Sequence, residues 1–178
     1  MRKANKEIQD RPVIIKLLRT CRVGRLATNG RNGYPIVKPV NFAYADGRIY
    51  IHSALAGEKI EDIKRDDRVC FETDLPIAFV RARIQPCEAA YLYRSVIIKG
   101  RASLVTDETE RAAAFRSLMD KYQPEGGYGP YVTEKLARTG IIRIDVEEMT
   151  GKEDLGKQDQ RDRVLAALEQ GLPLPMVL

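Results

Sequence analysis

Apolar positions near the start of the chain have the spacing of an amphipathic helix. Ile14, Leu17, Leu18 and Cys21 follow the i, i+3, i+4, i+7 pattern, which places them on one helix face. Residues 10–12, Asp-Arg-Pro, put a helix-capping side chain before a proline that a helix tolerates in its first turn. The pattern therefore predicts a first helix that buries one of its faces.

Residues 34–44 alternate with a period of two, which is typical of a strand. Lys38 and Val40 share one face of this strand, and Val37 and Pro39 share the other. Because Pro39 has no backbone N–H to donate, the strand is expected to have an irregular or unpaired edge near its middle. An edge of this kind is a candidate place for a ligand.

The order of the remaining elements indicates the fold class. We expect strands over residues 22–29, 34–44, 48–52, 68–74 and 141–146, two strands within 77–105, a short helix that ends near residue 66, a long helix that starts at residues 106–107, and a terminal helix around residues 164–168. The strands come in runs joined by hairpins instead of alternating with helices. This order favours an antiparallel barrel with helices at its ends over a doubly wound parallel sheet.

Composition limits the kind of protein. The chain has 178 residues, of which 44% are hydrophobic and 31% charged, so one folded domain with an appendage is expected. Its longest uninterrupted apolar run is five residues, whereas a membrane-spanning helix needs about 20. The basic start is not followed by an apolar stretch of signal-peptide length. We therefore expect neither a membrane-spanning nor a secreted protein.

Charge and thiol content exclude further classes. The net charge is +5, but basic and acidic residues are interleaved, as in residues 58–68, and this argues against a nucleic-acid partner. Cys21, Cys70 and Cys87 are far apart, and His52 is the single histidine, so no metal site is expected. An odd number of scattered thiols indicates a reducing compartment, and the cytoplasm fits best.

Residues 151–158 satisfy the G-x-x-x-x-G-K pattern of a nucleotide-binding loop. Gln158, however, stands where such a loop has the Ser or Thr that binds magnesium. Glu153 and Asp154 would also place carboxylates beside the phosphates. We therefore interpret this segment as part of a polar, exposed linker over residues 147–163.

The run from His52 to Lys59 is a candidate anion site. A strand end leads through small residues into a helix start, so backbone amides, the Ser53 hydroxyl and the Lys59 ammonium group come together, as a phosphate requires. An ordinary strand-to-helix turn fits the same residues. His52 is either a half-buried strand residue or a proton donor in redox chemistry. Arg94 and Ser95 begin a strand and fit either the sheet surface or a site.

Several of these motifs, in this order, resemble one known family. They are residues 34–42 (YPIVKPVNF), 46–53 (DGRIYIHS), 57–60 (GEKI), 68–72 (RVCFE), 93–96 (YRSV) and Gly100. Together they resemble the FMN-binding split-barrel family related to pyridoxamine 5′-phosphate oxidase, and most of all its nitroimidazole-resistance (Nim-type) branch. The resemblance covers residues 10–148, and we expect residues 149–178 to form a polar linker and a C-terminal helical tail.

The resemblance implies a mainly β, α+β fold: a six-stranded antiparallel split barrel with Greek-key connections and peripheral helices. It also implies a homodimer with FMN at the subunit interface. The residues that it assigns to FMN are Val37, Lys38, Pro39, Val40, Asn41, His52, Ser53, Gly57, Lys59, Arg94 and Ser95. In this assignment Lys59 binds the phosphate, the strand from Val37 to Asn41 runs beside the ring, and Ser95 stands where the oxidase branch has a glutamine. Lys38 or Arg94 would stabilise an anionic reduced flavin.

Departures from the oxidase branch shape the expected activity. Glu58 replaces a second basic residue beside the lysine, and the chain has no tryptophan, so pyridoxamine phosphate oxidation is not expected. We predict an FMN-dependent oxidoreductase that reduces a small organic acceptor, such as a nitro compound or a quinone, with His52 as catalytic proton donor. The alternative is a non-catalytic flavin- or heme-binding or sensing protein on the same barrel. A deazaflavin is a further possible cofactor.

Overall fold

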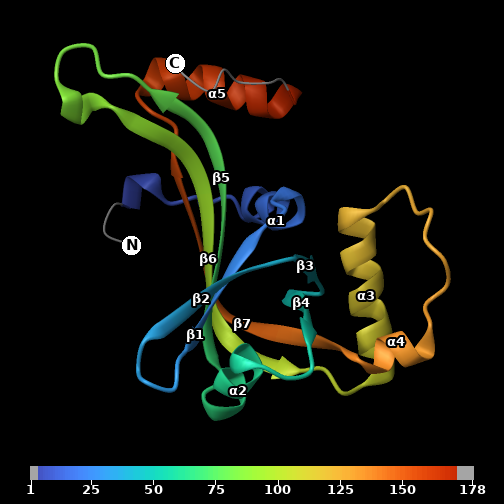
Figure 1. Cartoon of the computed structure of the whole chain (residues 1–178). Coiled ribbons are helices and arrows are strands. Elements are labelled where there is room, and N and C mark those ends of the chain that lie inside the picture. The colour runs from blue at the N-terminus through green and yellow to red at the C-terminus, as the bar shows by residue number, and fades with distance from the viewer. Residues whose placement is uncertain (1–3, 172–178) are drawn as a thin grey trace. The chain divides into compact units, whose positions relative to one another are not determined.

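The computed structural model describes residues 4–171, which divide into two compact units. Among the described residues, the larger unit comprises residues 18–73 and 97–149, and the smaller unit comprises residues 4–17, 74–96 and 150–171. Three long strands, β5 (Arg68–Val80), β6 (Ala90–Leu104) and β7 (Thr139–Asp154), contribute residues to both units (Figure 1). Each unit is described by itself.

One antiparallel sheet organises the larger unit. Its other strands are β1 (Gly24–Asn29), β2 (Pro35–Val40), β3 (Phe42–Ala45) and β4 (Arg48–Ala54). The strand order is β2-β1-β5-β6-β7-β4-β3, with β2 and β3 at the two edges. The sheet therefore has seven strands and is not closed by hydrogen bonds, whereas the sequence predicts a six-stranded barrel. The mainly β, antiparallel class of the fold is confirmed.

The number of strands differs because the chain breaks at Asn41. Residues 34–44 form two strands instead of one, since β2 pairs with β1 and β3 pairs with β4. Asn41 alone separates them, so the two edges of the sheet must curl toward each other at this residue. Elsewhere two predicted strands are one: the strand predicted at 68–74 and the first of the two strands predicted within 77–105 form the single strand β5.

The C-terminal end of helix α3 (Glu108–Tyr122) is hydrogen-bonded to the chain next to the break at Asn41. The Tyr122 hydroxyl accepts a hydrogen bond from the Phe42 amide at 3.0 Å and donates one to the Arg22 carbonyl at 2.6 Å. The Phe42 ring beneath is fully buried and meets Phe71 edge-on, with 4.8 Å between ring centroids. Gly24 lies against both rings, and a side chain there would overlap Phe71.

Helices α2 (Glu58–Arg65) and α3 cover the sheet of the larger unit. α2 is the predicted short helix that ends near residue 66, and it buries Ile60 and Ile63. α3 begins after Asp107, whose side chain accepts a hydrogen bond from the Glu110 amide at 2.7 Å, so the predicted start of the long helix is confirmed. A short helix, α4 (Thr133–Ala137), follows α3.

The apolar face of α3 packs on β3 and β4. Leu118 is buried together with Ala43, Tyr50 and Ile141. Ala114 is the buried alanine of the helix, whereas Ala112 is only partly buried. Helix propensity is high along this alanine-rich segment, so only the contact with the sheet distinguishes the two positions.

The smaller unit contains the short helices η1 (Ala4–Lys6) and η2 (Pro86–Glu88), most of α1 (Arg11–Thr20), and α5 (Gln158–Gln170). The predicted first helix is thus confirmed as α1, and α5 is the terminal helix expected from the sequence. The core of this unit consists of Ala78, Leu92, Leu155 and Val164. Residues 172–178, the end of the predicted C-terminal tail, lie outside the described residues.

The interpretation of residues 147–163 as an exposed linker is wrong. β7 runs on to Asp154, and Gly151, Glu153 and Leu155 are buried. The Ile8 amide donates to the Gly151 carbonyl at 3.0 Å, so the strand end is covered by the N-terminal segment. The division of the chain at residue 148 stays a prediction, but the first residues beyond it belong to this strand.

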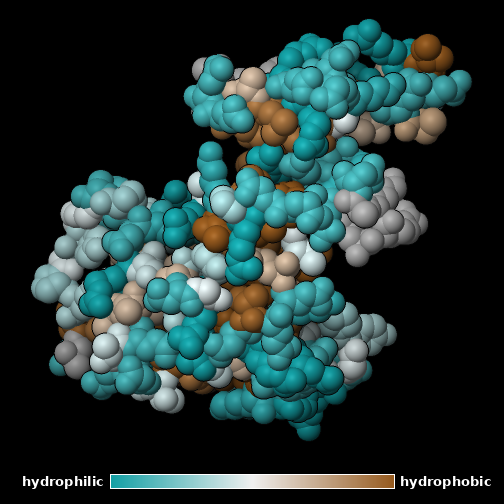
Figure 2. All heavy atoms as spheres, turned by 180° about the vertical axis from the view of Figure 1, so that it is seen from behind, coloured by the Kyte–Doolittle hydropathy of each residue, from teal (hydrophilic) through white to brown (hydrophobic). Residues whose placement is uncertain are grey.

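Polar side chains dominate the face of the molecule in Figure 2, with scattered hydrophobic atoms between them. None of the helices within residues 4–171 combines the length and the apolar composition that a bilayer-crossing helix needs. In the same residues, no three His, Cys, Asp or Glu side chains are grouped so that they could hold a metal ion.

Candidate functional site

The predicted anion site lies where β4 gives way to α2. Gly57 precedes the helix with φ 118° and ψ 171°, a conformation that glycine adopts far more readily than other residues. No side chain caps the amino end of α2. The Ile60 and Glu61 amides donate to the Gly57 carbonyl at 2.9 and 3.1 Å. The Glu58 and Lys59 amides, which come before them, have no carbonyl to bind within the helix and are available to an external acceptor such as a phosphate oxygen.

Two lysines meet at this helix start. Lys59 is half-buried, and its pKa is lowered by burial and by the nearby positive charge of Lys38. Lys38 reaches the same place from β2, where its ammonium group forms an ion pair with Glu58 at 2.6 Å. The second cation that the sequence lacks beside Lys59 is thus supplied by the neighbouring strand, and Glu58 partly neutralises it.

The edge of the sheet beside this cluster is open. β2 is the terminal strand in the sheet order, paired with β1 with Pro39 opposite Arg25. Val37 is 59% exposed, and Pro39 and Asn41 are also exposed, whereas Val40 is buried. The missing N–H of Pro39 is tolerated because β2 is an edge strand, as the sequence predicts. The free edge offers backbone groups and an exposed surface to a flat ligand.

His52 and Ser53 lie at the end of β4. The Ser53 side chain is buried, whereas His52 is exposed, and its ring lies 6.4 Å from that of Phe115. Phe115 is followed by Tyr131 at 6.2 Å, and Tyr131 by Tyr128 at 6.2 Å. These four rings, the aromatic row, begin at the predicted catalytic residue and continue along the loop after α3.

Sequence reasoning missed the aromatic row. Tyr128 and Tyr131 lie in or just after a glycine-rich loop, where local pattern gives no indication that they approach α3. Burial raises the pKa of Tyr131, and the neighbouring Tyr128 and the negative charge of Asp120 act in the same direction. Tyr131 therefore remains neutral, and the rings of both tyrosines are partly open to solvent.

A buried carboxylate supports α2 from below. Asp62 is 2% exposed and accepts hydrogen bonds from the Thr28 hydroxyl of β1 and from Arg65, both at 2.9 Å. Burial raises its pKa, but the hydrogen bonds from Arg65 and Thr28 and the positive charges of Arg65 and Lys38 outweigh that effect and lower it. Asp62 belongs to the interleaved charges of residues 58–68, which do not indicate that one of them is buried, so sequence reasoning missed this anchor.

Nine of the eleven predicted cofactor residues belong to the larger unit, and Arg94 and Ser95 belong to the smaller one. The Arg94 Nε donates to the Glu153 carboxylate at 2.9 Å. The structure brings together Lys38, Gly57 and Lys59 around the start of α2. A flavin contact for Arg94 and Ser95 stays a prediction.

The sheet is open and antiparallel, and its two edge strands are separated by Asn41 alone. Lys38 and Lys59 lie at the start of α2 beside one edge. This arrangement is that of the split-barrel class of proteins. The chain belongs to the pyridoxamine 5′-phosphate oxidase family, whose sequence model matches residues 10–153. This match confirms the resemblance found in the sequence. No curated protein matches the chain.

Solved structures of similar fold include a candidate 5-nitroimidazole antibiotic resistance protein from Bacteroides thetaiotaomicron, 25% identical, with a TM-score of 0.73 over 83% of this chain and 86% of that one. A flavocytochrome from Azotobacter vinelandii is 21% identical, with a TM-score of 0.77 over 91% and 77% of the two chains. An FAD-binding protein from Mesorhizobium loti is 28% identical, with a TM-score of 0.58 over 82% and 95%.

Proposed function

We propose that the larger unit binds FMN and that the protein is an FMN-dependent oxidoreductase acting on a small organic acceptor. One observation carries the proposal: Lys38 and Lys59 converge on the uncapped start of α2, beside the open edge of β2. The family match and the flavin named for two of the similar structures support the same class of cofactor.

Each part of the site has its own task. Lys59, Lys38 and the first-turn amides of α2 bind the phosphate, and Gly57 leaves room because no side chain projects from the turn. The strand from Val37 to Asn41 lies beside the ring and orients it through backbone groups. Bound flavin supplies the electron transfer itself, and the protein supplies binding and orientation.

A planar acceptor, such as a nitro compound or a quinone, is supported by the aromatic row. Flat rings stack favourably on exposed aromatic faces, at about 0.5–1.5 kcal/mol per pair beyond area burial. Tyr128 and Tyr131 are 44% and 43% exposed, so part of each ring is open for a flat ligand to cover. His52, at the end of the row, donates a proton to the reduced acceptor.

We further propose that two copies of the chain form a homodimer with FMN at the interface, and that the protein works in the cytoplasm. Val37 on the open edge and the neighbouring Tyr34, 70% exposed, are large apolar side chains that a second copy would cover. Light scattering of the FMN-loaded protein tests this proposal, with a mass of twice the chain's 20.1 kDa as the expected result.

The deciding experiment is the visible spectrum of the purified protein, followed by titration of the apoprotein with FMN. We expect a flavin spectrum, and we expect the dissociation constant for FMN to rise at least about tenfold in Lys59→Gln. Bleaching by NADPH and recovery with a nitroaromatic or quinone would support turnover, and His52→Ala should keep FMN while lowering that turnover. A bound flavin that is never reoxidised by an acceptor contradicts the enzyme and favours a sensing role.

The same spectrum separates the alternative cofactors. A Soret band would contradict FMN and favour heme, with His52 as the one imidazole available in the sequence to bind iron. Mass spectrometry of the released cofactor distinguishes FMN from FAD and from a deazaflavin.

A further inference from the structure

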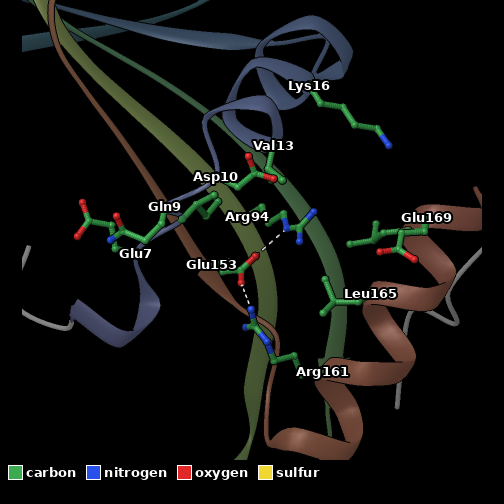
Figure 3. A pocket seen from close by; sticks show the side chains of 12 residues that line it. Glu7, Gln9, Asp10, Val13, Lys16, Arg94, Glu153, Arg161, Leu165 and Glu169 are labelled. Carbon is green, nitrogen blue, oxygen red and sulfur yellow. Dashed lines mark hydrogen bonds and ion pairs between the residues drawn. The ribbon is translucent and has the colours of Figure 1, made fainter.

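A cavity of ≈490 Å³ lies within the smaller unit, apart from every residue of the proposed FMN site in the larger unit. It is enclosed by the N-terminal segment and α1, by β6 and β7, and by α5 (Figure 3). A volume of this size suits a small organic ligand, since such sites measure about 300–1,000 Å³. Glu153, from the G-x-x-x-x-G-K segment at residues 151–158, lies at the floor of this cavity.

The floor of the cavity carries an ionic triad. The Glu153 carboxylate accepts hydrogen bonds from the Arg94 Nε at 2.9 Å and from an Arg161 terminal nitrogen at 2.5 Å. Glu153 is 8% exposed, and the Arg94 side chain is 13% exposed. One carboxylate between two guanidinium groups leaves one net positive charge in a poorly solvated place, which a ligand anion would neutralise.

The terminal N–H groups of Arg94 are not used in its bond to Glu153. Within residues 4–171, Arg94 is bonded to Glu153 through its Nε atom. Its two terminal nitrogens lie on the side of the guanidinium group that faces α5 (Figure 3). A guanidinium group presents its N–H donors in a planar fork that matches a carboxylate in a bidentate way. The unused end of the fork thus points into the cavity.

The walls and the rim restrict the ligand further. Ile8, Val13, Leu165 and Leu168 give the cavity apolar walls. Glu7, Asp10, Glu169 and Lys16 also line it, so four acidic and three basic side chains surround the cavity. The rim carboxylates repel any anion in proportion to its charge, so they oppose a phosphate ester more strongly than a single carboxylate held by the Arg94 fork. The combination selects a ligand with a single negative charge and an apolar body.

We propose that this cavity binds a small organic monocarboxylate, with its carboxylate on the terminal nitrogens of Arg94 and its apolar body against Val13 and Leu165. The site is separate from the proposed function and does not depend on bound flavin. In this role Glu153 and Arg161 are positioning residues, because they hold the Arg94 guanidinium in place through Nε.

The test is isothermal titration of the full-length protein with benzoate, its neutral analogue benzyl alcohol, and inorganic phosphate. Benzoate should bind at least about tenfold more tightly than either of the others. Equal binding of benzoate and benzyl alcohol, or a benzoate dissociation constant far above about 1 mM, would overturn the proposal.

Matched variants locate the binding. Arg94→Gln should weaken benzoate at least about tenfold, and Leu165→Trp, which adds bulk to the apolar wall of the cavity, should do the same. Arg101→Gln, on the same strand but outside the cavity, should leave benzoate binding unchanged. Unchanged binding in Leu165→Trp would place the ligand elsewhere and refute the assignment. Flavin content, measured by absorbance in each variant, reports separately on the proposed function.

Discussion

The ammonium group of Lys38 lies 2.6 Å from the Glu58 carboxylate, across the gap between an edge strand and the first turn of α2. The same ammonium group lowers the pKa of Lys59, after the larger effect of burial. Glu58 therefore holds one of the two cations that we propose for phosphate binding, and partly neutralises it. This relationship determines how positive the site is.

Releasing Lys38 should tighten FMN binding. In Glu58→Gln the competing carboxylate is gone, so the affinity of the apoprotein for FMN is expected to rise by about three- to tenfold, as measured by flavin fluorescence quenching. Lys64→Gln, an exposed lysine on the same helix that pairs with Glu61, is the control and should leave the affinity unchanged. Weaker binding by Glu58→Gln would mean that Glu58 orients Lys38 instead of neutralising it.

The buried Asp62 makes stability depend on acid pH. Its pKa is lowered in the folded protein, so its contribution is present above the pKa of the unfolded chain and is lost as the pH falls toward the folded value. Asp62→Asn should lower the free energy of unfolding by about 1–3 kcal/mol at pH 7, and by less at acid pH, in urea titrations. Glu61→Gln, exposed on the same helix, should show neither effect.

Lys121 should also make stability rise with pH, but in the alkaline range. Burial, aided by the positive charge of Arg22, lowers its pKa to about 8, although it donates to the Leu18 carbonyl at 3.0 Å and lies 3.3 Å above the centre of the Phe42 ring. Between pH 8 and the ordinary lysine value, the unfolded chain binds the proton more tightly, so stability rises with pH.

Replacement of this lysine tests the assignment. The free energy of unfolding of the wild type, measured relative to Lys121→Met, should increase by about 1 kcal/mol between pH 7.5 and 9.5, after allowance for partial solvent screening. Using the difference between the two proteins removes the contribution of all other titrating groups. A difference that stays flat over this range would show that Lys121 keeps its ordinary pKa.

Gly100 is predicted to be intolerant of any side chain. A Cβ atom at this position would overlap the Asp145 carbonyl of the adjacent strand β7, whose backbone is fixed by its pairing with β4. Gly100→Ala should destabilise the protein by about 1–3 kcal/mol in thermal or urea unfolding. Gly129→Ala is the control, because its Cβ would have no neighbour within 4 Å and should cost nothing measurable. Equal stability of the two variants would contradict the close approach of β6 and β7.

The sequence by itself determined the elements whose signals are local. The spacing of apolar residues and the capping side chain Asp107 fixed the positions of α1 and α3, because helix hydrogen bonds and caps join residues four or fewer positions apart. The order of hairpins fixed the antiparallel class, and the ordered motifs identified the family. Lys59 and Gly57 were found for the same reason, since a helix start is a local event.

Only the tertiary structure decided which distant segments meet. The break at Asn41 arises because β2 and β3 pair with different strands, and alternation within residues 34–44 is the same whether one strand or two form. Lys38 reaches Glu58, Thr28 reaches Asp62, and Arg94 reaches Glu153 across 20, 34 and 59 residues of chain. Such pairs depend on the register and curl of the whole sheet, which no short stretch of sequence specifies.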